Sequence, residues 1–251
     1  MSMPLVFLHG WGQSVRIWQM QTEYFSPKAE VYAMNLPGHG DMPDAPADAW
    51  LDALAGEMPA GPSMLVGWSL GGLLAMQMAL EHPEHIAGLV LVSATPCFCS
   101  RADWPHGCAD HVFAGFEQGI ATQTDKTMHR FFALMLHGDT LTRPEHNHIT
   151  QLATDRSHLP TLSGLQAGLA LLSGLDLREN LQQINCPVLI MHGDRDAIIP
   201  IAAGHYLAEH IPDTSWLPFR DCGHTPFLSR PEHFNEQLEA WCQTISSAQQ
   251  G

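Results

Sequence analysis

Basic residues and long hydrophobic runs are both scarce in this sequence, and each scarcity excludes a class of protein. The 251 residues include 11 Lys and Arg against 26 Asp and Glu, so the formal net charge is −15 at pH 7. Such an excess of negative charge opposes general affinity for nucleic acid or anionic membranes. No stretch approaches the roughly 18–20 continuous apolar residues of a membrane-spanning helix. We therefore expect a protein that binds neither nucleic acid nor membrane.

Cysteines are few and carry no zinc-binding pattern. None of the six stands at a CxxC spacing; they occupy positions 97, 99, 108, 186, 222 and 242. No basic segment precedes the first apolar run, which we interpret as a strand and not as a signal peptide. We expect a cytoplasmic protein with free thiols, the alternative being a disulfide within residues 97–108, where three cysteines cluster. The scattered histidines predict no metal site, and we expect no organic cofactor.

What the sequence does contain is a regular alternation of apolar runs and helical patterns. Hydrophobic residues make up 45% of the chain and charged residues 15%, as in a globular protein. Several runs, such as residues 89–92 and 188–191, are apolar throughout, which is typical of strands buried on both faces of a parallel sheet. The predicted strands span residues 4–8, 30–34, 64–67, 88–92, 188–191 and 215–219.

Helical patterns separate these strands. Strands that alternate with helices predict an α/β fold with a doubly wound, mostly parallel sheet. The predicted helices span residues 15–25, 48–57, 70–82, 201–210 and 231–244.

The alternation is interrupted between the fourth and fifth predicted strands. Residues 97–181 contain no good candidate for a buried strand, whereas apolar residues recur at i, i+3, i+4 and i+7 from Met128 to Met135. We interpret this stretch as a helical cap, or lid, inserted into a core formed by residues 1–96 and 182–251.

A Gly-Trp-Ser-Leu-Gly pentapeptide occupies residues 67–71, between an apolar strand and a helical pattern. This is the Gly-x-Ser-x-Gly nucleophile elbow in the context that it requires, a strand followed by a sharp turn and a helix. The turn needs residues without bulk beside the serine, because its backbone is strained and its neighbours pack closely. The motif predicts Ser69 as a nucleophile at the carboxyl end of the sheet.

A nucleophilic serine needs a base, and the base needs an acid that orients it. The fifth predicted strand leads into Asp194 and Asp196, and the sixth leads into His224. The chain order Ser, Asp, His is the one that this kind of fold uses. All candidates follow the carboxyl ends of predicted parallel strands, where such sheets bind ligands. The spacing alone leaves the choice between Asp194 and Asp196 open.

The first predicted strand ends in His-Gly-Trp-Gly at residues 9–12. A loop of this kind supplies one backbone N–H of an oxyanion hole, and the residue after the nucleophile supplies another. We therefore predict that the N–H groups of Trp11 and Leu70 form the oxyanion hole.

With these motifs in place, the chain resembles the α/β-hydrolase superfamily over nearly its whole length. Leu-Pro-Gly-His-Gly at residues 36–40, Gly-Asp-Arg-Asp at 193–196 with Ile-Pro at 199–200, and Gly-His at 223–224 carry this resemblance. More narrowly, the chain resembles the pimeloyl-[acyl-carrier protein] methyl ester carboxylesterases of biotin synthesis (the BioH family). The narrower match rests on Gly-Trp-Ser-Leu-Gly-Gly at residues 67–72 and on segments at 96–98, 103–105, 112–116, 130–131 and 176–178.

The resemblance implies a role for each residue of a catalytic triad. Ser69 is implied as the nucleophile, His224 as the base and Asp196 as the acid, because the acid of the family precedes the Ile-Pro element. Trp11, Leu70 and His224 are then implied to contact the substrate. Two residues of the cap, Phe131 and Met135, are implied to face its acyl chain.

The resemblance also implies a surface for a partner. Basic cap residues of the family receive the acidic acyl carrier protein, and Arg130 and Arg143 match such positions. Lys126 matches a third position conservatively, whereas Asn147 replaces a basic residue. The simpler alternative is that Arg130 and Arg143 are solvated helix residues.

Two further departures from the family pattern lead to expectations. Residues 1–3 leave no room for the two N-terminal strands usual in the fold, so we expect about six parallel strands. Asn35 stands where many relatives have Asp before Leu-Pro-Gly, which we expect to be silent for catalysis.

The sequence therefore predicts a monomeric serine carboxylesterase that releases methanol from the methyl ester of pimeloyl-[acyl-carrier protein]. One alternative is a promiscuous short-chain carboxylesterase that acts on free, small-molecule esters. The other is a non-catalytic receptor with the same fold, which the intact triad disfavours.

Overall fold

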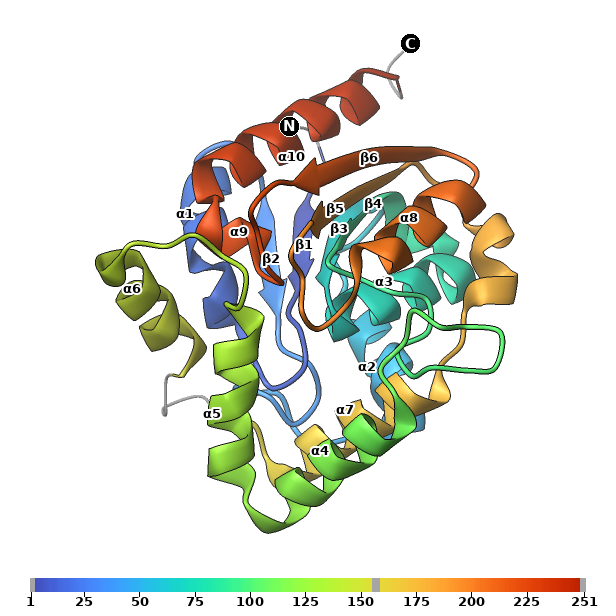
Figure 1. Cartoon of the computed structure of the whole chain (residues 1–251). Coiled ribbons are helices and arrows are strands. Elements are labelled where there is room, and N and C mark those ends of the chain that lie inside the picture. The colour runs from blue at the N-terminus through green and yellow to red at the C-terminus, as the bar shows by residue number, and fades with distance from the viewer. Residues whose placement is uncertain (1–2, 155–158, 249–251) are drawn as a thin grey trace.

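The computed structural model describes residues 3–154 and 159–248, which contain a six-stranded parallel sheet (Figure 1). The strand order is β2-β1-β3-β4-β5-β6. The predicted α/β-hydrolase fold with a parallel sheet of this size is confirmed, and every predicted strand overlaps an observed one. The strands are β1 (Leu5–Leu8), β2 (Val31–Met34), β3 (Ser63–Trp68), β4 (Ile86–Val92), β5 (Val188–Gly193) and β6 (Thr214–Phe219).

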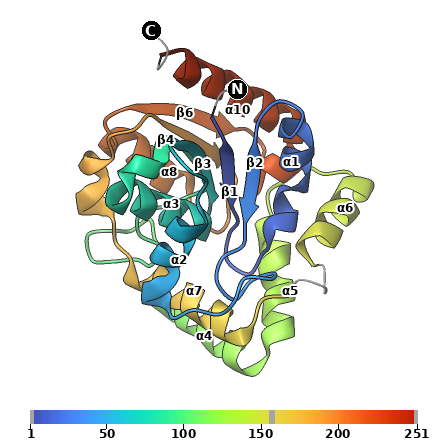
Figure 2. The same ribbon diagram turned by 180° about the vertical axis from the view of Figure 1, so that it is seen from behind.

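Helices cover both faces of the sheet (Figures 1 and 2). On one face, α1 (Gln19–Phe25) packs against α10 (Pro231–Ala248). On the other face lie α2 (Trp50–Glu57), α3 (Leu70–Glu81) and α8 (Ile201–His210). This three-layer arrangement leaves the carboxyl ends of the strands free of these helices.

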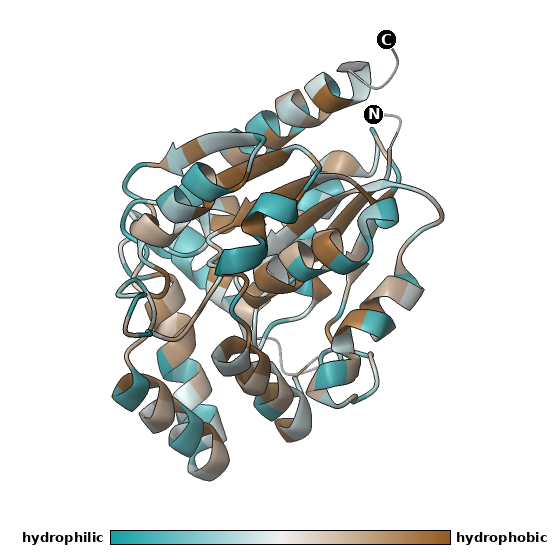
Figure 3. Cartoon of the chain, turned by 90° about the vertical axis from the view of Figure 1, so that its right-hand side faces the viewer, coloured by the Kyte–Doolittle hydropathy of each residue, from teal (hydrophilic) through white to brown (hydrophobic). Residues whose placement is uncertain are grey.

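Each strand divides its side chains between two hydrophobic layers. In β1, Val6 and Leu8 belong to the layer that includes α2 and α3, whereas Leu5 and Phe7 belong to the layer that includes α1 and α10. Successive side chains of a strand point to opposite faces, so a strand covered on both sides must be apolar throughout. Every residue of β4 is accordingly buried. The concentration of apolar residues in the sheet is visible in Figure 3.

The starts of three helices can be compared with the predictions. The predicted helix at residues 15–25 opens as a 3-10 helix, η1 (Val15–Trp18), and becomes α-helical only at Gln19. The predicted helix at 48–57 is likewise preceded by a 3-10 turn, η2 (Ala47–Ala49). Neither N-cap residue forms a side-chain capping hydrogen bond, and each helix begins with the tighter bonding of a 3-10 turn. The last helix starts at Pro231, as predicted, because the first turn needs no N–H from that residue.

Four helices of the described residues lie between β4 and β5. Two segments close the base of this insertion: the Leu177 N–H donates to the Pro96 carbonyl at 2.9 Å, and Cys97 pairs with Asp176 in an antiparallel bridge. Figures 1 and 2 show α4, α5 and α7 beyond the carboxyl ends of the strands. The helices are α4 (Asp110–Thr122), α5 (Thr124–Met135), α6 (Arg143–Ala153) and α7 (Leu162–Gly174); a 3-10 helix, η5 (Arg178–Gln183), follows them.

Two other expectations can be compared with the structure. All six cysteines are free in the structure. Within residues 3–154 and 159–248, no helix combines the length and the hydrophobicity that a membrane crossing requires.

Candidate active site

Ser69 lies in the turn between β3 and α3 with a φ of 55°, a left-handed conformation that is strained for a residue with a Cβ. Backbone hydrogen bonds hold this turn on both sides. The Ser69 N–H donates to the Val92 carbonyl at 3.0 Å, and the Ser69 carbonyl accepts from Gly72 and Leu73. The turn therefore keeps the serine side chain beyond the carboxyl end of the sheet, where it lines a cavity.

Close packing around the turn explains its glycines. A Cβ on Gly71 would lie 2.5 Å from the His9 carbonyl oxygen, so α3 can approach β1 only without a side chain there. A Cβ on Gly10 would lie 2.9 Å from the Trp68 ring and 3.2 Å from Ser69 Cβ. The loop after β1 is thus in direct contact with the serine turn.

His224 and Asp196 form a buried pair. His224 Nδ1 and Asp196 Oδ2 are 2.7 Å apart, and both side chains are inaccessible to solvent. The second carboxylate oxygen accepts from the backbone N–H groups of Ile198 and Ile199 at 2.8 and 2.9 Å. The loop after β5 therefore fixes the carboxylate, and the carboxylate fixes the imidazole.

Opposing effects act on the pKa of Asp196. Desolvation by burial raises it, but the charge of His224 and hydrogen bonds from His192 and His224 outweigh this effect. The pKa of the carboxyl consequently lies well below its usual range. An ionised Asp196 accepts a hydrogen bond from the Nδ1–H of His224, which leaves the Nε2 lone pair available to a proton.

The other ring nitrogen of His224, Nε2, can accept a hydrogen bond. His224 Nε2 is buried and has no hydrogen-bond partner among the described residues. Trp68, the neighbour of Ser69, donates from its indole Nε1 to the His224 carbonyl at 2.9 Å. The two rings also lie 5.4 Å apart between centroids. Trp68 thereby links the loop of the histidine to the turn of the serine.

Asp194 has a different role from Asp196. Its Oδ1 accepts from the Cys222 N–H at 3.4 Å, which braces the loop after β6. Of the two carboxylates that the sequence left open, the structure brings only Asp196 to the imidazole.

The backbone groups predicted to form the oxyanion hole come from neighbouring elements. β1 and β3 pair in parallel with Leu8 opposite Gly67, so the loop that contains Trp11 lies beside the serine turn. Leu70 is the first residue of α3, and a helix has no internal acceptor for its first N–H groups. The positive end of the α3 dipole also lies there.

Two buried histidines hold the loop of Trp11. His9 Nε2 accepts from the Leu36 N–H at 3.0 Å, and His39 Nε2 accepts from the Gly12 N–H at 3.3 Å. Each Nδ1 faces a backbone carbonyl, which completes the neutral tautomer. Desolvation, assisted for His9 by the charge of His39, lowers the pKa of His9 to about 3. Desolvation also lowers the pKa of His39 to about 4.

Sequence reasoning assigned no role to His39, which entered only as part of the Leu-Pro-Gly-His-Gly segment at residues 36–40. Asn35, by contrast, was noted as a departure and has an evident structural role. Its Oδ1 accepts from the Val15 N–H at 2.9 Å, and its Nδ2 donates to Asp41 Oδ1 at 2.7 Å.

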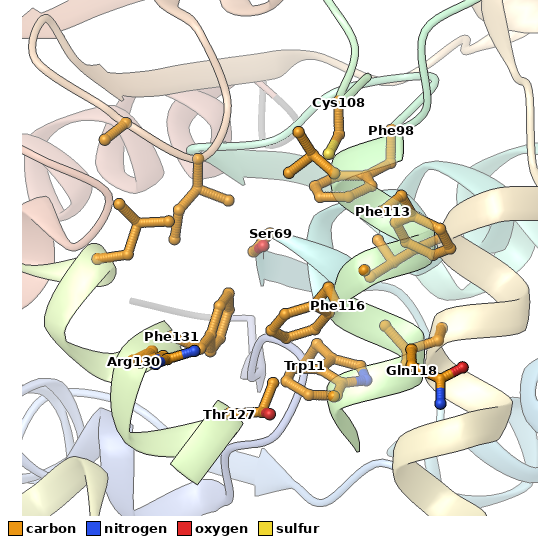
Figure 4. Close-up of a pocket in the computed structure, with 18 of the residues that line it drawn as sticks. Trp11, Ser69, Phe98, Cys108, Phe113, Phe116, Gln118, Thr127, Arg130 and Phe131 are labelled. Atoms are coloured by element: carbon orange, nitrogen blue, oxygen red, sulfur yellow. The ribbon is translucent and has the colours of Figure 1, made fainter. Parts of the chain in front are cut away.

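A cavity of about 530 Å³ opens in front of Ser69 (Figure 4). Polar side chains such as Gln118, Thr127 and Arg130 enter it from α4 and α5. Its other walls are largely apolar, which suits an acyl chain with its reacting end at Ser69. The principal apolar residues are Trp11, Phe98, Phe113, Phe116, Phe131, Leu134, Leu169, Leu172 and Ile198.

Of the two cap residues predicted to face the acyl chain, Phe131 and Met135, only Phe131 lines the large cavity. Phe131 lines the cavity and packs edge-on against Trp11 at 5.2 Å between centroids. Met135 does not line the cavity, contrary to expectation. It is fully buried at the end of α5, where its carbonyl accepts from the His224 N–H at 3.2 Å. Its side chain instead lines a second, smaller cavity together with Phe132 and Leu136.

The three basic residues of the predicted carrier patch are exposed. Lys126 and Arg130 lie one turn apart on α5, and Arg130 also lines the cavity. Arg143 is the first residue of α6. In the described part of the chain, no cluster of three or more His, Cys, Asp and Glu side chains could hold a metal ion.

Comparisons with known proteins bear on the family and the fold of this chain. A family model described as the alpha/beta hydrolase fold matches residues 3–231. A pimeloyl-[acyl-carrier protein] methyl ester esterase from Aromatoleum aromaticum is 41% identical over 236 residues, 91% of this chain and 93% of that protein. A protein of the same name from Nitrosomonas europaea is 38% identical over 94% of each chain.

Solved structures show the same fold. An esterase from Exiguobacterium antarcticum superposes with a TM-score of 0.86 at 22% identity, covering 96% of this chain and 92% of that one. A bromoperoxidase from Bacillus anthracis gives a TM-score of 0.86 at 22% identity, with 97% and 92% covered. The chain belongs to the α/β-hydrolase family and, within it, to the family of the pimeloyl-[acyl-carrier protein] methyl ester esterases.

Proposed function

We propose that this protein is a serine carboxylesterase that hydrolyses the methyl ester of pimeloyl-[acyl-carrier protein] and releases methanol. The observation that carries the proposal is the buried pair of His224 and Asp196, 2.7 Å apart, beside the strained turn of Ser69. The names of the relatives supply the substrate class.

We infer the mechanism from the chemistry of these residue types and from the pairing of His224 with Asp196. His224 Nε2 takes the Ser69 hydroxyl proton while Ser69 Oγ attacks the ester carbonyl carbon. The N–H groups of Trp11 and Leu70 stabilise the oxyanion of the tetrahedral intermediate. Asp196 stays ionised and stabilises the imidazolium that forms. The imidazolium then protonates the departing methoxide, which leaves as methanol.

A water molecule completes the cycle. His224 removes a proton from water, the hydroxide attacks the acyl-enzyme, and Ser69 leaves with the proton returned by the imidazolium. The products are the free carboxylic acid and the regenerated serine. No electron transfer occurs in either half of the reaction.

The cavity supports an acyl chain whose far end leads to a carrier. Residues 97–181 act in this proposal as a cap whose aromatic side chains contact the methylene groups. Lys126, Arg130 and Arg143 receive the acidic acyl carrier protein outside the cavity. We further propose a monomer in the cytoplasm.

The test compares two substrates and two proteins. The methyl ester of pimeloyl-[acyl-carrier protein] and free dimethyl pimelate are hydrolysed by the wild type and by Ser69→Ala. We expect a larger kcat/KM for the carrier-bound ester and a loss of about three or more orders of magnitude in Ser69→Ala. Thermal unfolding of both proteins controls for folding. Near-wild-type rates in a folded Ser69→Ala variant would falsify the mechanism.

Equal or faster hydrolysis of the free ester would leave the triad in place and favour a general short-chain carboxylesterase. Asn147 and the net charge of −15 favour this second candidate, because both weaken attraction to an acidic carrier.

A further inference from the structure

The turn that follows α5 contacts the loop of His224 directly. We refer to residues 136–140 as the α5 turn. Its Asp139 Oδ1 accepts from the Gly223 N–H at 2.8 Å. Immediately before the turn, the Met135 carbonyl accepts from the His224 N–H at 3.2 Å. Two consecutive N–H groups, at the histidine and at the residue before it, are therefore held by the insertion and not by the sheet.

The α5 turn also packs closely on the loop of the acid. Gly138 adopts a φ of 94°, and a Cβ there would lie 2.6 Å from the Arg195 carbonyl oxygen, one residue before Asp196. On the other side, a Cβ on Gly223 would lie 2.6 Å from the His137 carbonyl oxygen and 3.0 Å from Asp139 Oδ2. One short segment thus lies against both loops that carry the His224–Asp196 pair.

Asp139 has surroundings that are unusual for a loop carboxylate. Burial raises its pKa, while the hydrogen bond from the Gly223 N–H and the neighbouring Ser229 hydroxyl and Cys222 thiol act in the opposite direction. The charged group that faces this site is Arg230, whose guanidinium donates to the Thr140 carbonyl at 3.4 Å. The proposed mechanism assigns no step to Asp139, so its burial calls for another explanation.

The same helix also contacts the substrate cavity. Phe131 and Arg130 of α5 line the cavity, and a Cβ on Gly12 would lie 2.7 Å from Met128 Cε. α5 thereby contacts the cavity and the loop of Trp11 along its length, and reaches the loop of His224 at its end. A rigid helix that ends in an anchored turn can fix the positions of the cavity wall, the loop of Trp11 and the loop of His224 relative to one another.

We propose that Asp139 is a positioning residue for His224, which acts by accepting the Gly223 N–H hydrogen bond and so anchors the histidine loop to α5. This inference deepens the proposed function and rests on it. Removal of the acceptor leaves the Gly223 N–H unpaired, and the loop shifts to find another partner. A displacement of about 1 Å at a general base lowers the rate about a hundredfold, whereas substrate binding in the apolar cavity is untouched.

The test uses three variants of the whole chain. Asp139→Ala removes the acceptor, Asp139→Asn keeps a carbonyl oxygen at the same place without the charge, and Thr140→Ala is the matched control in the same turn. We expect Asp139→Ala to lower kcat about tenfold to a hundredfold with KM changed less than about twofold. We expect Asp139→Asn to recover most of kcat and Thr140→Ala to match the wild type.

Nuclear magnetic resonance supplies a readout that does not depend on turnover. The low-field signal of the His224 Nδ1–H should persist in the wild type and in Asp139→Asn, and should shift or broaden in Asp139→Ala. If Asp139→Ala does not fold, Asp139→Ser replaces it, since serine is too short to reach the Gly223 N–H from the same backbone position.

Two results would overturn the inference. One is a folded Asp139→Ala variant with wild-type kcat and an unchanged His224 signal. The other is an Asp139→Asn variant as slow as Asp139→Ala, because the hydrogen-bond acceptor would then not be the cause. Failure of the proposed function looks different: wild-type protein hydrolyses no ester, while the His224 signal still reports whether Asp139 positions the ring.

Discussion

Among single residues, Asp196 and Asp194 illustrate how two carboxylates two positions apart acquire different chemistry. Asp196 is buried, accepts two backbone N–H bonds and contacts the imidazole of His224. Asp194 accepts one backbone N–H from Cys222 at 3.4 Å. Only a carboxylate at the position of Asp196 can hold the tautomer of His224 and stabilise its charged form.

This difference gives a prediction for matched amide variants. Asp196→Asn preserves the shape of the side chain but removes the charge that favours the Nδ1–H tautomer of His224, so kcat should fall about 10³- to 10⁴-fold. Asp194→Asn keeps an acceptor for Cys222, so kcat should change less than about fivefold. Steady-state kinetics on the proposed ester measure both variants. Equal losses in the two would mean that the acid has been assigned to the wrong residue.

At the scale of elements, the serine turn depends on the close approach of α3 to β1 and β3. The approach is possible because Gly71 presents only a hydrogen atom to the His9 carbonyl. Nothing similar constrains Gly56 near the end of α2, where an added Cβ would meet no atom within 4 Å beyond its own helix backbone. The two helical glycines therefore serve different purposes.

We predict opposite effects of alanine at these two glycines. Gly71→Ala forces α3 away from β1 and should lower the free energy of unfolding by about 2–3 kcal/mol, with a loss of activity because Ser69 moves with the helix. Gly56→Ala should raise the free energy of unfolding by about 0.5–1 kcal/mol, because alanine favours a helix over the unfolded chain. Urea unfolding measures both changes. A Gly71→Ala variant of wild-type stability and activity would contradict the close packing described above.

At the scale of the whole molecule, stability depends on keeping His9 and His39 uncharged. The N–H groups of Leu36 and Gly12 need the unprotonated Nε2 atoms as acceptors. Desolvation lowers the pKa of His9 to about 3 and that of His39 to about 4, whereas an unfolded histidine titrates near 6.5. Between these values the unfolded chain binds more protons than the folded protein, so acid favours unfolding.

The sign and size of the pH effect follow from these pKa values. The contribution of the two histidines to stability is complete above about pH 6.5 and decreases as the pH falls, toward about 3 for His9 and about 4 for His39. Each lowers the free energy of unfolding by roughly 2 kcal/mol between pH 7.5 and pH 5. Urea midpoints across this range measure the effect. In His39→Gln, whose side chain does not titrate, the dependence should be shallower; an identical slope in that variant would contradict the assignment to His39.

Local patterns in the sequence were sufficient for the sheet and for placing the candidate serine, acid and histidine after the ends of its strands. An uninterrupted apolar run such as residues 89–92 can be stable only between two hydrophobic layers, so strands could be recognised without knowledge of their neighbours. Ser69, Asp196 and His224 follow the ends of such strands, and parallel strands bring their carboxyl ends to one edge. The placement of these residues at one edge of the sheet could thus be predicted from the sequence.

Contacts between distant segments could not be read from the sequence in this way. The choice of Asp196 over Asp194 needed the resemblance, and the geometry depends on which loop atoms face His224. Met135 follows the same helical period as Phe131, yet Phe131 lines the large cavity and Met135 lines a smaller one. Asp139 contacts Gly223 across 84 positions of sequence. A single periodicity fixes which face of a helix is apolar, but only tertiary packing decides which neighbour that face meets.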